Sequence, residues 1–449
     1  MPLDVFSIVS ILTFALTIFL AFKQPLVKIP FTSKYVKINY GTAPLIGVAI
    51  LLATFTINLN TAAAGIVGSA QLKPWSIIIM IISLSYVCVS LDYTGFFEYV
   101  SLKVARASKN SGRRLFIYFF LLTTVLTLFT DNDIVILTMT LIIFYVAKNA
   151  GMNPIPFLFV QFFTVNILGI ALYIGNPTNI IAADAYGLGF VEFAKWMLLP
   201  SLLAGVTCLL IFWLLFRRSI PRRIKPPKIE PSSALKNRRG AMFGFAMLVL
   251  TIVFMSLPTN LLGVPLWGIA LFFAMVMLVH DVVSYRSKIS TIYSRMPWEV
   301  VPFLIGLFII VESLAATGWT ELLGSQLALI SGSTIVVVLG VCILSSLSAG
   351  VMCNHPMSIF FVRAMQSPAF AAAPQTARLG GTLALIAGAS FGANLTLIGS
   401  LAGIMWVKIL ADKGCSITFS QFSKRGFLIM PIVILVTCLA IIAEIALMG

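Results

Sequence analysis

Long apolar runs follow one another along the whole chain, and they constrain its fold more than any other feature. The chain of 449 residues is 60% hydrophobic and only 10% charged, whereas about 25% of the residues of a soluble domain are charged. Many runs approach the ~20 residues that a helix needs to cross the hydrocarbon core of a membrane. The sequence therefore predicts an all-α polytopic membrane protein. The first run, near residues 4–22, has no basic start and no small-residue cleavage site, so we expect a retained span.

Basic residues are concentrated in the loops between the apolar runs. The net charge is +16, and 25 of the 30 Lys and Arg residues lie in five clusters, at 23–37, 103–114, 217–239, 286–295 and 408–425. Basic loops of membrane proteins face the cytoplasm, so this placement explains the charge without a nucleic-acid partner. It predicts an integral membrane protein, in contact with the lipid bilayer, whose large basic loop is cytoplasmic.

The two halves of the chain resemble each other. The segment KPWSIIIMIISLSYVCVSLDYTGFFE (73–98) aligns without a gap on MPWEVVPFLIGLFIIVESLAATGWTE (296–321). The charge rule places Trp75 on the outer side of the membrane and Trp298 on the inner side, so the halves run in opposite directions. Inverted repeats with broken segments at matching positions are typical of secondary transporters.

These observations define the predicted architecture. We expect two inverted repeats of about five spans plus one re-entrant hairpin each, with unwound helices at mid-membrane. The expected regions are an N-terminal transmembrane repeat at 1–216, a basic cytoplasmic linker at 217–240 and a C-terminal inverted repeat at 241–449. The expected hairpins are 115–148 and 333–366, and the expected interrupted spans are 154–187 and 369–407.

Each half contains two polar interruptions of an apolar segment. Irregular backbone survives inside a membrane only where it lines a protected, polar cavity. Pro177 lacks an N–H and Gly175 permits turns that other residues avoid, so the GNPTN segment must unwind. Helix N-termini at such breaks favour anions, and freed carbonyls suit cations. We therefore expect the four breaks to form one substrate and ion pocket, with the candidate binding residues Asp131, Asn132, Asp133, Gly175, Asn176, Thr178, Asn179, Asn354, His355, Asn394, Thr396 and Ser400.

Surface loops are the alternative interpretation of these breaks. A surface loop at GNPTN would leave too few residues on either side for complete spans, so that alternative fails there. It stays open for the TDND segment at 130–133.

Ionisable residues inside apolar segments need a reason, because a charge at mid-membrane costs about 2.5–3.5 kcal/mol on insertion scales. Asp131 and Asp133 are the first candidates for proton or coupling-ion work, since two close carboxylates repel and one then tends to hold a proton. His355 fits a proton carrier or a hairpin-turn residue. Asp184 fits the site or an outer vestibule, and Glu312 fits the site or a structural role; both are secondary candidates.

Four stretches resemble the arsenite/antimonite permease (ArsB) family of the ion-transporter superfamily. They are SLDYTGFFEYVSLKVAR, LFTDNDIVILTMTLI, NPTNIIAADAYGLGFVEFAKWMLLP and LTLIGSLAGIMWVKIL, within a resemblance that covers roughly residues 75–449 in order. The resemblance implies an inner-membrane exporter that lowers cytoplasmic arsenite and antimonite in exchange for protons. Sodium/proton antiporters and divalent-anion/sodium symporters are more distant relatives.

The chain departs from the family pattern within the predicted pocket. The family's Asn-Asp tip matches Asn132-Asp133, but Asp131 is an additional acid. The second tip of the family usually carries paired asparagines before Met-Pro, where this chain has Cys353-Asn354-His355-Pro356. GNPTN is closer to the antiporters and anion symporters. Cys353 is a further secondary candidate because trivalent arsenic favours thiolates, although tight capture needs two or three thiols together.

The leading hypothesis is a secondary active transporter that exports arsenite and antimonite by proton-coupled alternating access. The alternatives are a sodium/proton antiporter, a sodium-coupled anion (dicarboxylate-type) transporter and, from another class, a passive channel. An enzyme is not expected, since a zinc protease needs His-Glu-x-x-His and the two histidines, His280 and His355, are far apart. The predicted partners are a small inorganic ion or oxyanion and a coupling proton or sodium ion, with a homodimer and a soluble ATPase left open. No cofactor, metal or catalytic residue is predicted.

Overall fold

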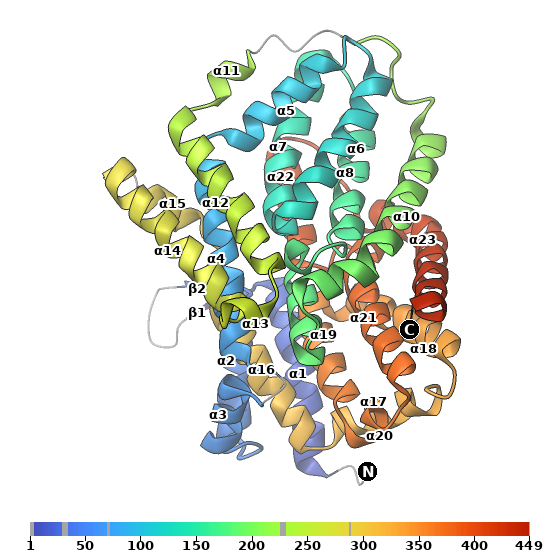
Figure 1. Cartoon of the computed structure of the whole chain (residues 1–449). Helices are drawn as coiled ribbons and strands as arrows, with labels where there is room; N and C mark the ends of the chain where they lie inside the picture. The colour runs from blue at the N-terminus through green and yellow to red at the C-terminus, as the bar shows by residue number, and fades with distance from the viewer. Residues whose placement is uncertain (1–3, 29–34, 70–71, 225–229, 287–288, 449) are drawn as a thin grey trace.

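The computed structural model describes residues 4–28, 35–69, 72–224, 230–286 and 289–448. Almost all of the regular structure in these ranges is helical (Figure 1). Ten of the described helices are long and apolar enough to cross a membrane. The all-α polytopic fold predicted from the apolar runs is therefore confirmed. A small antiparallel sheet of β1 (Leu26–Lys28) and β2 (Tyr35–Lys37), with Leu26 opposite Lys37, projects from one side of the helical body.

The described residues of the first half form ten α-helices and one 3-10 turn. They are α1 (Val5–Lys23), α2 (Thr42–Ala53), α3 (Leu59–Val67), α4 (Pro74–Tyr93), α5 (Phe96–Ala107), α6 (Gly112–Phe129), α7 (Asn132–Ala150), α8 (Ile155–Leu168), η1 (Tyr173–Gly175), α9 (Pro177–Tyr186) and α10 (Phe190–Phe216). The breaks expected at TDND and GNPTN separate α6 from α7 and α8 from α9.

The second half follows the short linker helix α11 (Pro231–Ala234). Its helices are α12 (Arg238–Ser256), α13 (Thr259–Leu262), α14 (Leu266–Tyr285), α15 (Ile289–Arg295), α16 (Val300–Ala316), α17 (Trp319–Leu329), α18 (Thr334–Met352), α19 (Asn354–Met365), α20 (Pro368–Ala371), α21 (Gln375–Leu395), α22 (Leu401–Asp412) and α23 (Phe419–Met448). The segments predicted at 333–366 and 369–407 are interrupted as expected.

The order of elements from α4 to α10 recurs from α16 to α23. In both halves a spanning helix is followed by a short helix, a helical hairpin, a broken helix and a long final helix. Gly95 before α5 and Gly318 before α17 have φ angles of 83° and 84°, a left-handed conformation that suits glycine. The α6–α7 hairpin lies in the upper half of the molecule, and α17, α18 and α20 lie in the lower half (Figure 1).

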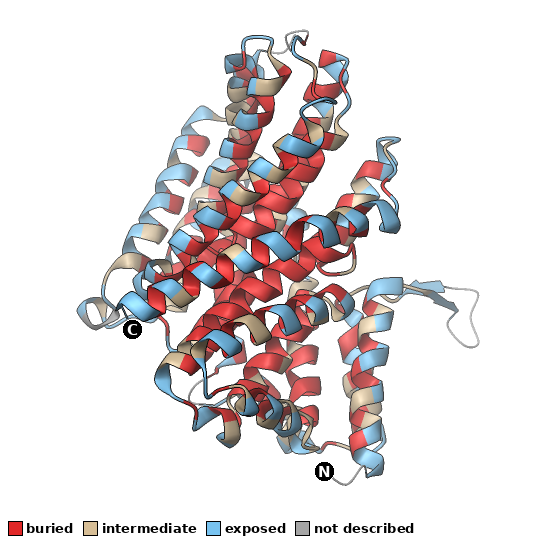
Figure 2. Ribbon diagram, turned by 90° about the vertical axis from the view of Figure 1, so that its right-hand side faces the viewer, coloured by how far each residue is buried: buried red, intermediate tan, exposed pale blue. Residues whose placement is uncertain are grey.

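The broken helices lie inside the molecule, and complete helices surround them. Figure 2 shows buried residues concentrated along the centre and exposed residues on the outer faces. Among the spanning helices, α4 and α16 are the most buried, whereas α1, α10 and α14 each keep a large exposed face. Those exposed faces are apolar, as is required of helices that contact lipid.

Helices α18 and α21 pack closely because small residues face each other. A Cβ added at Gly388 would collide with the Ser345 hydroxyl, and one added at Gly392 would collide with Ala349. Gly388 and Gly392 are four residues apart, as are Ser345 and Ala349, so each pair occupies one helix face. Small residues at this spacing allow membrane helices to approach closely. This close contact holds α21, the helix that ends at the break before α22, against α18.

A buried carboxylate joins α4 to α14. Asp281 is fully buried, and it accepts hydrogen bonds from the hydroxyls of Tyr86 (3.0 Å) and Ser90. The ring Nδ1 of His280 lies 3.0 Å from the same carboxylate. A charge inside a membrane helix bundle needs such partners, so this cluster anchors α14 to the most buried helix.

Replacing Gly392 with leucine should force α18 and α21 apart. We expect destabilisation of about 1–3 kcal/mol, the usual range for overpacking, seen as a lower melting temperature of the purified protein in detergent. Gly332→Leu is the matched control, because a Cβ at Gly332 meets nothing within 4 Å. Equal melting temperatures for the two variants would contradict the close contact.

Candidate functional site

The N-termini of the helices that begin at the four breaks border one cavity of about 500 Å³, which we call the central cavity. Asp131 and Asp133 line it at the start of α7, Pro177 at the start of α9, His355 at the start of α19 and Leu401 at the start of α22. Helix N-termini carry partial positive charge. The central cavity therefore combines these positive helix ends with three carboxylates, those of Asp131, Asp133 and Glu299. Three of the predicted binding residues, Asp131, Asp133 and His355, line it directly.

The first hairpin tip places its two acids on the cavity wall. Asp131 is the N-cap of α7, and its carboxylate accepts a hydrogen bond from the backbone N–H of Asp133 (2.9 Å). This capping bond stabilises the start of α7, because it satisfies one N–H that the helix start leaves unpaired. Both acids are partly buried and reachable from the cavity.

Asn132, between the two acids, points away from the cavity into the protein. Its Nδ2 donates to Oδ1 of Asn166 on α8 (3.4 Å), and Nδ2 of Asn166 donates to Oδ1 of Asn394 on α21 (2.9 Å). Nδ2 of Asn394 donates in turn to the Phe163 carbonyl (3.2 Å). This buried chain of amides links the first hairpin to the broken helices of both halves.

The GNPTN segment satisfies its own unwound backbone. The side chain of Asn176 caps α9 by accepting from the N–H (3.0 Å) and hydroxyl (2.9 Å) of Thr178, and its Nδ2 donates to Ser390 on α21 (3.1 Å). Nδ2 of Asn179 donates to the carbonyls of Gly169 (2.7 Å) and Leu172 (3.0 Å). The polar residues of this break therefore replace the hydrogen bonds that a continuous helix would have made.

The second broken helix has an equivalent turn. Ser400 is the N-cap of α22 and accepts from the N–H of Gly403 (3.1 Å), so by cap position it corresponds to Asn176. In each break two glycines meet backbone to backbone: a Cβ at Gly175 would collide with the Gly169 carbonyl, and a Cβ at Gly399 with the Gly392 carbonyl. Asn394 precedes this turn and lies in the last turn of α21.

The second hairpin tip is attached to the second broken helix. The backbone N–H of Asn354 donates to the Gly399 carbonyl (3.0 Å), and the Thr396 hydroxyl donates to the Gly350 carbonyl. Cys353 forms the turn with a φ of 70°, an uncommon conformation for a residue with a side chain. His355 is buried, its ring meets that of Phe303 edge to face at 6.0 Å, and its Nδ1 has no hydrogen-bond partner among the described residues.

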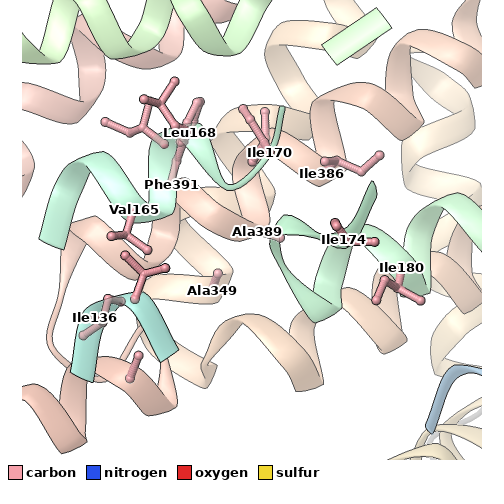
Figure 3. Close-up of a cluster of buried hydrophobic side chains, with 14 of the residues drawn as sticks. Ile136, Val165, Leu168, Ile170, Ile174, Ile180, Ala349, Ile386, Ala389 and Phe391 are labelled. Atoms are coloured by element: carbon pink, nitrogen blue, oxygen red, sulfur yellow. The ribbon is translucent and has the colours of Figure 1, made fainter. Parts of the chain in front are cut away.

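Apolar side chains surround these polar breaks. Figure 3 shows Ile136 of α7, Leu168 of α8, Ile180 of α9, Ala349 of α18 and Phe391 of α21 around them. All five are buried. Because this environment offers few other partners, the polar groups of the breaks depend on one another for their hydrogen bonds.

The three secondary candidates lie outside the central cavity. Asp184 faces Lys73, just before α4. Glu312 forms a two-point ion pair with Arg363, at 3.0 and 3.2 Å. The Cys353 side chain lines a separate, mostly apolar cavity of about 220 Å³ beside α1. Among the described residues, no group of three or more His, Cys, Asp or Glu side chains could hold a metal ion.

Comparison with known proteins identifies the family. The family model described as citrate transporter (CitMHS) matches residues 33–380. The chain belongs to the citrate transporter family. It is 26% identical to the arsenical pump membrane protein of Escherichia coli (strain K12) over 374 residues, which cover 82% of this chain and 86% of that protein. The arsenical pump membrane protein of Yersinia enterocolitica is 27% identical over 374 residues, which again cover 82% of this chain and 86% of that protein.

Two further proteins extend the comparison. The 46 kDa membrane protein of Mycobacterium leprae is 27% identical over 416 residues, which cover 88% of this chain and 92% of that protein. The crystal structure of the Alcanivorax borkumensis YdaH transporter matches 98% of both chains with a TM-score of 0.60 and 15% identity, a similarity of fold alone. The resemblance to arsenite permeases is confirmed, and this member of the citrate transporter family is an integral membrane secondary transporter.

Sequence reasoning missed several residues around the site. Tyr40, Arg295 and Glu299 line the central cavity, and Oε1 of Glu299 accepts a hydrogen bond from Asn39 (2.9 Å). The only sequence signal for Glu299 was its place in the repeated Pro-Trp motif. Asn166 was detectable as a lone amide in the apolar run FFTVNIL. Its partners could not be predicted, because they lie 34 and 228 residues away.

Replacing Asn166 with alanine should loosen the whole site. The change leaves the buried amides of Asn132 and Asn394 without their shared partner, and unsatisfied buried groups cost about 1–3 kcal/mol. We expect a lower melting temperature and reduced transport by the purified, reconstituted protein. Asn149→Ala is the control, because the side chain of the exposed Asn149 bonds to the Tyr145 carbonyl of its own helix and to no other described residue. An unchanged melting temperature for Asn166→Ala would contradict the proposed amide chain.

Proposed function

We propose that this protein exports arsenite and antimonite in exchange for protons, by alternating access through the central cavity. The observation that carries the proposal is the pair of carboxylates, Asp131 and Asp133, in a cavity bordered by four helix N-termini. The arsenical pump relatives support the choice of substrate. In this proposal the predicted repeats, at 1–216 and 241–449, move relative to each other around the cavity.

Exchange follows if the proton and the substrate compete for the same carboxylate. Trivalent arsenic and antimony acids carry hydroxyl groups, which donate hydrogen bonds to an ionised carboxylate. Protonation of Asp133 removes its negative charge and with it the stronger acceptor. A proton arriving from outside therefore displaces the substrate, and release of that proton inside restores the site. In this scheme His355 and the helix N-termini orient the substrate.

The residues beside the central cavity support a proposal about the side of the membrane to which it opens. Residues 294–300 line one side of this cavity and overlap the end of the basic cluster at 286–295. Basic loops face the cytoplasm, so we propose that this conformation opens inward and that the large loop at 217–239 is cytoplasmic. The proposed location in the plasma (inner) membrane is supported by the arsenical pump relatives.

A small carboxylate anion is the second candidate substrate. Four positive helix ends favour a negatively charged ligand, and the family description is citrate transporter. In this alternative the two aspartates bind a coupling cation, while the anion lies against the helix N-termini.

Transport into everted membrane vesicles separates these candidates. We expect labelled arsenite to accumulate when a proton gradient is imposed, and to leave when an ionophore collapses the gradient. Accumulation of citrate but not arsenite would favour the second candidate. Arsenite flux that is insensitive to the gradient would contradict coupling and indicate a channel.

Asp133→Asn should abolish proton-driven accumulation without preventing membrane insertion. Asparagine keeps the size of the side chain but cannot exchange a proton at neutral pH. We expect the rate to fall at least ~100-fold, the lower end of what a positioned proton-transfer group contributes, at unchanged protein levels in the vesicles. Asp412→Asn is the control, since Asp412 is exposed at the end of α22 and lines no described cavity. Coupled flux at the wild-type rate in Asp133→Asn would refute the assignment.

Asn176→Ala and Asn394→Ala should both weaken substrate binding. Each side chain holds a broken helix of one half against the other half, through Ser390 and Asn166 respectively. Loss of either hydrogen bond is expected to raise the dissociation constant about 10-fold, which corresponds to ~1.4 kcal/mol. Equilibrium binding of labelled arsenite would measure it. An effect in only one variant would argue against a site shared by both halves.

A further inference from the structure

A second cavity of about 470 Å³ adjoins the central cavity along α7. We call it the outer cavity, a name that does not refer to the outer side of the membrane. Leu137 lines the central cavity, and the next residue, Thr138, lines the outer one. The outer cavity continues along α7 to Lys148, two residues before the helix ends. Arg295 lines both cavities. The two cavities are therefore neighbours, with Arg295 at their boundary.

Four basic residues from separate parts of the chain converge on the outer cavity. Lys148 lies in the last turn of α7, Lys236 precedes α12, Arg295 ends α15 and Lys413 follows α22. Two acids, Asp92 and Glu98, also line it, so positive charge predominates. The three lysines are exposed, and none of them forms an ion pair within the part of the chain that the structure describes.

Arg295 is held only loosely where it lies. Its guanidinium is 3.5 Å from the Asp92 carboxylate and 5.7 Å from the centre of the Tyr93 ring, and its side chain is 44% exposed. Asp92 also accepts a long hydrogen bond from the Thr138 hydroxyl (3.4 Å). An exposed pair of this kind contributes about 0–1 kcal/mol. A bound anion can therefore replace Asp92 as the partner of Arg295.

We propose that the outer cavity is a binding site for small carboxylate or phosphate-bearing anions, held by Lys148, Lys236, Lys413 and Arg295. A cleft in which positive charge predominates attracts anions, and Arg295 places the bound anion beside the central cavity. The site goes beyond the proposed function, because it binds an anion whether or not the central cavity carries arsenite. A soluble anion and a lipid headgroup share the required chemistry.

Binding of labelled citrate to the purified protein in nanodiscs of zwitterionic lipid tests this site. We expect saturable binding that weakens as salt rises from about 0.01 M to about 1 M, because the Debye length falls from about 30 Å to about 3 Å. The variant Lys148→Gln/Lys236→Gln/Lys413→Gln should lose at least 10-fold in affinity, and Arg295→Gln should also weaken binding. The charge-matched control is Lys28→Gln/Lys37→Gln/Lys109→Gln, at exposed lysines outside the described cavities.

The outcomes separate the two proposals. Equal citrate affinity in the triple variant and in the wild type, or an equal loss in the control, would overturn the anion site. Displacement of citrate when anionic lipid is added supports a headgroup as the natural source, and no displacement supports a soluble anion. Citrate binding without arsenite transport would contradict only the proposed function, and arsenite transport without citrate binding would contradict only this inference.

Discussion

Every backbone N–H and carbonyl inside a membrane must find a hydrogen-bond partner within the protein, and the centre of this structure depends on that requirement. Two hairpin tips and two broken helices interrupt the regular backbone here, and nearby polar groups bond to backbone groups at each of them. The side-chain amide of Asn179 donates hydrogen bonds to the carbonyls of Gly169 and Leu172, and the backbone N–H of Asn354 donates to the Gly399 carbonyl. Most of these bonds lie within a single break, whereas those of Asn354 and Thr396 join the second hairpin tip to the second broken helix. The cavity between the breaks is therefore a consequence of the fold.

The same breaks determine the electrostatics of the cavity. A helix N-terminus stabilises a negative charge by about 0.3–1 kcal/mol when exposed, and by up to about 2 kcal/mol when partly buried. Four of them point at one space of about 500 Å³. The carboxylates of Asp131 and Asp133 use part of this field, while their mutual repulsion opposes full ionisation. In the proposed mechanism, the arrival of a single proton at this site changes its affinity for a polar or anionic ligand, which is what coupled exchange requires.

The sequence predicted the breaks better than it predicted their partners. Gly175 and Pro177 inside an apolar run were sufficient to locate an unwound helix, since both residues disfavour the interior of a continuous helix. The pairing of Glu312 with Arg363 and the approach of Asp184 to Lys73 join distant segments, so no local pattern predicts them. The hydrogen-bonded chain of side-chain amides through Asn166 could not be predicted for the same reason. The residue types in a transporter site are local information, whereas their partners depend on how the two halves pack.

The most direct test of the proposed transport site is to locate bound antimonite by anomalous X-ray scattering, because antimony is far heavier than any protein atom. We predict one strong peak in the central cavity, between Asp133 and His355, that is lost in the Asp133→Asn variant. A peak elsewhere, for example beside the Glu312–Arg363 ion pair, or a peak that persists unchanged in Asp133→Asn, would contradict the claim that the converging breaks form the transport site.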